Sequence, residues 1–155
     1  MDTGTTTIID GLKILNGVLT DGTQASGDIT IPDCVTEIAK KAFNNNTNIT
    51  SVVIPNTVTY VYDSAFNGCS GLKNATVPIS VAKRFCDVFN SGDIDVVVIL
   101  DGSSTYLDGS SFGLCRNVKS ITLPEGLVYI GPGAFHDCTN LTSITLPSSL
   151  TEIGI

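Results

Sequence analysis

Two side chains near the C-terminal end have the types and spacing that nucleophilic chemistry needs. His136 is the only histidine and lies two residues before Cys138. A base beside a thiol is the arrangement that activates a cysteine nucleophile. The alternative is an exposed turn residue, because the positions equivalent to His136 in the repeat described below hold Asn44, Asn67 and Asn90. We favour the turn and predict that the protein is not an enzyme.

The five cysteines fall into two groups. Cys69, Cys115 and Cys138 occupy equivalent positions, and buried thiols that pack as small hydrophobic side chains are the favoured interpretation. A disulfide between Cys115 and Cys138 on neighbouring repeats is the alternative. Cys34 and Cys86 occupy positions that are otherwise polar, so these two thiols could be accessible.

Other common sites are not indicated. The chain has no closely spaced cysteine pair for zinc and no glycine loop for phosphate. The run from Asp101 to Thr105 lacks the glutamate of a calcium loop, since position 112 is Phe. We therefore predict no metal or cofactor. The net charge of −7 argues against nucleic acid as a partner, and the longest apolar runs are too short for membrane insertion.

A repeat sets the positions of all these residues. Five of the six phenylalanines are 23 positions apart, at Phe43, Phe66, Phe89, Phe112 and Phe135. Prolines keep the same step, with Asp101 in the remaining slot, at Pro32, Pro55, Pro78, Pro124 and Pro147. We predict an uninterrupted 23-residue period over about 120 residues, which is typical of a solenoid.

Each repeat predicts a series of local elements. Apolar residues two apart, such as Ile29 and Ile31, precede the proline and predict strands that pair into one parallel sheet, with Val98 and Leu100 as their equivalents in the fourth strand. A second apolar pair predicts a short strand, and Ala-Phe predicts one helical turn. In the third repeat the spacing of residues 85–89 predicts either a longer helix or local repacking.

The two ends differ. Residues 1–26 are predicted to be an N-terminal capping segment with a hairpin at residues 12–20, because Asn16-Gly17 separates two apolar runs and favours a type I′ turn. Residues 27–155 are predicted to be an array of about five and a half repeats that is truncated at its C-terminus. Its third and fourth repeats are degenerate.

The segments 130–138 (IGPGAFHDC) and 141–154 (LTSITLPSSLTEIG) resemble the BspA-like leucine-rich repeat family. The resemblance covers residues 27–155, with departures at Arg84, Gly92 and Asp101. It implies a β-rich α/β solenoid, a right-handed coil with a parallel sheet, second short strands and one helical turn per repeat. It also implies a microbial protein that is secreted or lies on the cell surface and attaches to other cells or to host matrix proteins.

One candidate binding surface follows the second strands. Tyr60, Tyr106 and Tyr129 share an outward position there, with Lys83 between the first two. Tyrosine is enriched at protein interfaces because it combines a large apolar area with a polar group. The alternative is that tyrosine is simply a good strand residue.

A second candidate surface lies on the main sheet. Val53, Val97 and Ile99 are predicted to point outward there, so the fourth strand is apolar on both faces. Exposed apolar residues on a sheet are a candidate contact site. The alternative is that the irregular third repeat covers this strand.

These features together predict a non-catalytic, adhesin-like module that binds a protein, such as a host extracellular matrix or cell-surface protein. The alternative function is a structural spacer that presents another domain of a longer chain. The uncapped last coil also predicts edge-to-edge self-association.

Overall fold

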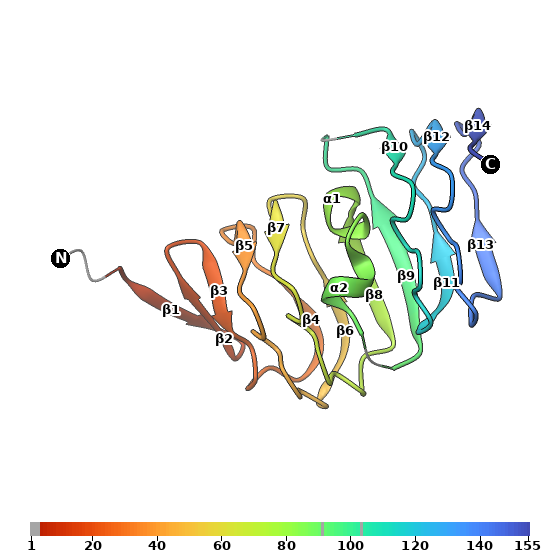
Figure 1. The fold of residues 1–155 in the computed structure, drawn as a ribbon. Coiled ribbons are helices and arrows are strands. Elements are labelled where there is room, and N and C mark those ends of the chain that lie inside the picture. The colour runs from red at the N-terminus through yellow and green to blue at the C-terminus, as the bar shows by residue number, and fades with distance from the viewer. Residues whose placement is uncertain (1–3, 91, 103) are drawn as a thin grey trace.

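The computed structural model describes residues 4–90, 92–102 and 104–155. Its strands follow one another along a single axis, from the N-terminal hairpins to the C-terminal coil (Figure 1). The main sheet is parallel and runs in the order β13-β11-β9-β8-β6-β4. Its strands are β4 (Gly27–Thr30), β6 (Ile49–Val53), β8 (Asn74–Pro78), β9 (Ile94–Ile99), β11 (Val118–Thr122) and β13 (Ser143–Thr145). The predicted solenoid with a continuous parallel sheet is confirmed.

Short strands follow the main strands along the chain and form two further sheets. One has the order β1-β2-β3-β5-β7 and the other the order β10-β12-β14. The two-residue strands are β5 (Glu37–Ile38), β7 (Tyr60–Val61), β10 (Tyr106–Leu107), β12 (Tyr129–Ile130) and β14 (Glu152–Ile153). The second strands are therefore present, but the third repeat interrupts the row between β7 and β10.

In the third repeat two short helices replace the second strand. They are α1 (Ile79–Ala82) and α2 (Phe85–Val88). Arg84, which stands where other repeats have a buried aliphatic residue, is the N-cap of α2. In the first repeat the Ala42-Phe43 segment forms consecutive turns with i to i+3 hydrogen bonds and no regular helix. Of the two alternatives for the third repeat, the structure shows the longer helical segment, and the described residues of the other repeats contain no regular helix.

The register of β9 corrects the uninterrupted period. Val96, not Val98, pairs with Ala75 on β8 and with Ile121 on β11. The paired residues are therefore 21 positions apart from Ala75 to Val96 and 25 positions apart from Val96 to Ile121. A slip of two residues leaves each side chain on its expected face, because side chains along a strand alternate. The segment that contains α1 and α2 is therefore two residues shorter than the period, and the following segment is two residues longer.

The six phenylalanines form one stack through the core. Neighbouring ring centroids are 4.5–5.8 Å apart, in the order Phe43, Phe66, Phe89, Phe85, Phe112, Phe135. Phe85 lies outside the repeat register and occupies the space between Phe89 and Phe112, where two repeats separate. A single 23-residue unit has too few apolar residues for its own core, so this shared stack is what lets each turn stabilise the next.

Two hairpins precede the first turn of the solenoid. β2 (Leu12–Leu15) and β3 (Val18–Asp21) pair antiparallel over the predicted hairpin, and Asn16 and Gly17 both have positive φ. β1 (Thr6–Ile9) pairs antiparallel with β2 and was not predicted. The hairpins extend the short-strand sheet, since β3 pairs with β5, and no described strand pairs with the outer edge of β4.

Candidate binding surface

The predicted tyrosine positions lie on the short strands, in two sheets that the third repeat separates. Tyr60 pairs with Glu37 on the neighbouring strand, and Tyr129 pairs with Tyr106 on one side and Glu152 on the other. We call Tyr60, Arg84, Lys83, Tyr106 and Tyr129 the aromatic ridge. Two cations occupy the gap between Tyr60 and Tyr106, where the third repeat has helices.

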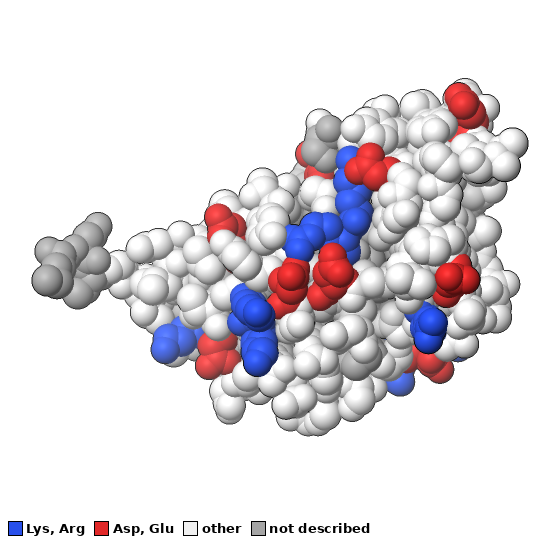
Figure 2. All heavy atoms as spheres, viewed as in Figure 1, with Lys and Arg blue, Asp and Glu red and all other residues white. Residues whose placement is uncertain are grey.

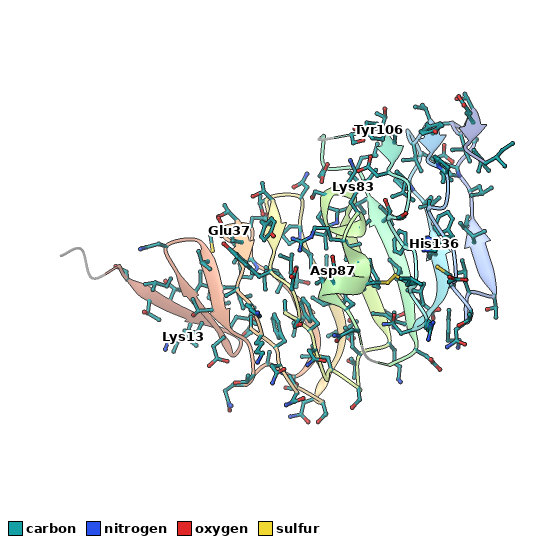
Figure 3. The ribbon with its side chains drawn as sticks, viewed as in Figure 1. Lys13, Glu37, Lys83, Asp87, Tyr106 and His136 are labelled. Carbon is teal, nitrogen blue, oxygen red and sulfur yellow. A yellow bond between two sulfur atoms is a disulfide. The ribbon has the colours of Figure 1, made fainter. Side chains whose placement is uncertain are left out.

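Lys83 links the third repeat to Tyr106. Its Nζ atom lies 4.5 Å from the centroid of the Tyr106 ring and 3.1 Å from Oδ2 of Asp108. The ammonium group therefore has a cation–π contact and an ion pair, which together restrict a long and otherwise mobile side chain. Figure 3 shows Lys83 directed toward Tyr106, as its predicted place between two tyrosines requires.

Arg84 makes a cation–π contact with Tyr60 of the preceding repeat. Its guanidinium carbon lies 4.8 Å from the centroid of the Tyr60 ring, and its nitrogens form ion pairs with Asp63 and Asp87. Tyr62 packs edge-on against Tyr60. In the sequence, Arg84 stands out only as a departure from the repeat, and Tyr62 is not among the predicted site residues. The adjacent cations Lys83 and Arg84, which lie between two tyrosine positions, were the sequence signal that could have indicated these contacts.

The ridge is accessible. Tyr60 is 41% exposed and Tyr106 is 46% exposed, while Tyr129 is partly buried. Figure 2 shows basic and acidic side chains meeting over the position of α1 and α2, with mostly uncharged surface around them. The ridge is therefore a locally charge-balanced surface with exposed aromatic rings, a composition typical of protein interfaces.

The main-sheet candidates lie on a different surface. Val53 and Val97 are 37% and 42% exposed, and Thr76 pairs with both of them. They are consequently neighbours in one outward row. Ile99 is only partly buried and pairs with Pro78. The third repeat does not cover Val97, and because the main sheet and the short strands are separate sheets, the valines do not join the aromatic ridge.

The structure does not assemble a nucleophilic site from His136 and Cys138. Nδ1 of His136 lies 2.9 Å from the carbonyl oxygen of Gly133 in its own turn. The Cys138 thiol donates to the carbonyl oxygen of Phe112, and burial raises its pKa, so the reactive thiolate is disfavoured. The exposed-turn interpretation of His136 describes its environment correctly.

The cysteine predictions need correction. Cys86, expected to be accessible, forms a disulfide with Cys115, expected to be a buried thiol or the partner of Cys138. The Cα atoms are 5.4 Å apart although 29 residues separate them in the sequence. The bond joins α2 to the turn after Phe112, so it fastens the irregular third repeat to the next one. Cys69 is a buried thiol as predicted, and Cys34 is exposed.

Possible metal ligands and membrane-spanning helices can be assessed in residues 4–90, 92–102 and 104–155. Within them, no cluster of three His, Cys, Asp or Glu side chains is placed to hold a metal ion. Asp101 accepts a hydrogen bond from the backbone amide of Ser80, and Ser103 lies outside the described residues. No helix in the described part of the chain is long and apolar enough to cross a membrane.

Comparison with protein families decides the identity of the repeat. A model of the BspA type leucine rich repeat region matches the chain in six copies, over residues 13–105 and 105–155. The chain belongs to this family. BspA-type repeats are generally non-catalytic. The match begins within the first hairpin, so it includes part of the segment that was predicted to be a separate cap.

A solved structure of a bacterial leucine-rich repeat protein shows the same fold. That protein, from Eubacterium ventriosum ATCC 27560, is 18% identical, with a TM-score of 0.59, and the match covers 99% of this chain and 49% of that one. A leucine rich cell surface protein from Faecalibacterium prausnitzii A2-165 is 25% identical, with a TM-score of 0.48 over 99% of this chain and 51% of that one. The BspA-type chain thus spans about half the length of these proteins. A search of curated proteins found no match.

Proposed function

We propose that this BspA-type array is a protein-binding module of a secreted or cell-surface protein, and that the aromatic ridge is its contact surface. The observation that carries the proposal is the stacking of Lys83 on Tyr106 and of Arg84 on Tyr60. Tyrosine and arginine are the residues that most often dominate protein interfaces. The two cations lie where helices replace the second strand of the third repeat, and each contacts a tyrosine of a neighbouring repeat, which supports a role other than packing.

The ridge is already ordered in the free chain. Ion pairs with Asp63 and Asp108 fix the two cations, and the cations fix the rings beside them. A partner therefore meets side chains that have already lost most of their rotamer freedom, which lowers the entropic cost of association. Acidic residues bordering the ridge favour a partner with basic side chains at its rim. Host extracellular matrix or cell-surface proteins are the partner class that the family suggests.

The spacer function has one observation in its favour. The cation–π contacts also connect the third repeat to its neighbours, so the same residues contribute to the stiffness of the coil. A spacer needs those contacts for stability alone. Binding and stability measurements on the same variants therefore separate the two functions.

The test replaces Tyr60, Tyr106 and Tyr129 by Ser and measures binding to purified extracellular matrix proteins and to whole host cells. We expect each substitution to weaken binding about fivefold, the effect of roughly 1 kcal/mol at an interface residue. Val128→Ser is the matched control, since Val128 is exposed immediately before β12 but lies outside the ridge. Equal attachment by all variants, with unchanged melting temperature, would leave the spacer as the function.

A further inference from the structure

Within the described residues, no strand pairs with the outer edge of β4, the first strand of the main sheet, and this edge opens into a cavity of about 560 Å³. β4 pairs with β6 on one side only, because the N-terminal hairpins join the short-strand sheet instead. The cavity lies between β4 and the turn that connects β1 with β2. Its lining includes Asp10, Leu12, Gln24, Asp28, Ile29 and Thr30.

The hydrogen bonds of β4 show which backbone groups face this cavity. The amide of Gly27 bonds to the carbonyl of Asn48, and the amide of Ile31 bonds to the carbonyl of Val53. Alternate residues of a parallel strand bond to opposite neighbours. Asp28 and Thr30 therefore direct their N–H and C=O groups away from β6, toward the cavity. Unpaired groups of this kind are a template for another strand.

The side chains around the cavity define the chemistry of an occupant. Leu12 and Ile29 are buried and give it an apolar floor, while Asp10 and Asp28 bring two carboxylates to the rim. Hydroxyl groups of Thr50 and Ser51 donate to the Asp28 carboxylate at 2.7 and 2.8 Å and lower its pKa. An extended segment with a basic side chain satisfies both the free backbone groups and this negative charge.

We propose that the edge of β4 binds an extended peptide segment of a partner protein, which adds to the main sheet as a strand and places a Lys or Arg beside Asp10 and Asp28. Main-chain hydrogen bonds supply affinity in this mode of recognition, and alternate side chains supply specificity. The site is separate from the aromatic ridge and does not depend on it. Failure of either site leaves the other intact.

Two variants remove different parts of the site and leave the hydrogen bonds between β4 and β6 in place. Thr30→Pro removes an amide that faces the cavity and takes no part in pairing with β6. Asp10→Asn with Asp28→Asn removes the charge. Asn is well suited to the positive φ of residue 10, and its side-chain oxygen still accepts from Thr50 and Ser51. Asp95→Asn is the control, because Asp95 also accepts a hydroxyl hydrogen bond but lies in the middle of the sheet.

The probe is a library of random displayed octapeptides, selected on the chain with soluble Thr30→Pro protein as competitor. Selected sequences are expected to be rich in β-branched residues and to contain Lys or Arg. The synthetic peptides should shift the backbone amide resonances of Asp28 and Thr30. They should bind Thr30→Pro at least about tenfold more weakly and the Asp10, Asp28 double variant about fivefold more weakly. Asp95→Asn should bind as the unchanged chain does.

Three results would overturn the proposal: no peptide is enriched, the peptides bind both variants equally well, or the shifted amides lie elsewhere. Sedimentation of the free protein tests a second copy as the occupant. If the free protein associates and Thr30→Pro abolishes that association, the segment that binds the β4 edge belongs to a second copy of the chain and not to a partner protein. Circular dichroism checks that each variant is folded, and if Thr30→Pro is not, the double variant carries the test.

Discussion

Val96 pairs with Ile121 across β9 and β11, two residues from the position that a constant period assigns. The slip moves Asp95 beside Ser120, where the carboxylate accepts a hydrogen bond from the hydroxyl at 2.7 Å. It also moves Val97 into one row with Val53. A compensated deletion and insertion thus changes which side chains are neighbours, while each side chain keeps its face of the sheet.

A double-mutant cycle tests this register. Asp95→Ala and Ser120→Ala should show a coupling of about 0.5 kcal/mol in the free energy of unfolding, measured by urea denaturation. The reason is that the two side chains are hydrogen-bonded only in the slipped pairing. A constant 23-residue register instead places Val97 beside Ser120. Coupling between Val97 and Ser120, with none between Asp95 and Ser120, would contradict the structure.

Phe85 is the ring that keeps the stack continuous across the irregular repeat. Phe85→Ala should reduce the free energy of unfolding by about 3–5 kcal/mol, because it leaves a cavity between two fully buried rings. Phe135→Ala is the control, since Phe135 is only partly buried and ends the stack. We expect roughly half the loss for this variant in thermal or urea unfolding. A smaller effect for Phe85 than for Phe135 would show that the stack is not continuous.

Thiol labelling tests the cysteine assignments. Iodoacetamide at pH 8 should modify Cys34 first, since it is exposed. Burial raises the pKa of the Cys69 thiol to about 11, so its thiolate is scarce at pH 8 and it should react only when the chain unfolds. Mass spectrometry of the denatured chain should find three labels without reductant and five with it. Five labels without reductant would exclude the Cys86–Cys115 bond.

Substitutions in the last coil test the predicted self-association. Ile144, Leu146 and Ile153 are exposed, whereas their equivalents one repeat earlier are buried. In this 155-residue chain, replacing the three by Thr should weaken association measured by sedimentation at high concentration, because it removes apolar area at an open edge. Ile8→Thr is the control at the other end. If the unchanged chain sediments strictly as a monomer at high concentration, the prediction of self-association is wrong.

Much of the fold follows from local regularity. The spacing of Phe43 and Phe66 predicts the period, and the alternation around Ile29 predicts which face each strand buries, because both depend only on distance along the chain. Asn16-Gly17 predicts a hairpin for the same reason, since a type I′ turn is a property of two residues. The outward position of the tyrosines follows from alternation as well.

What the sequence did not predict depends on contacts between distant residues. The slip at Val96, the disulfide between Cys86 and Cys115 and the insertion of Phe85 into the stack all arise where the third repeat packs against the fourth. Residues that depart from a repeat have no equivalent elsewhere in the chain, so periodicity cannot place them. The sequence determined the solenoid and its faces, and tertiary packing decided which side chains meet across the irregular repeat.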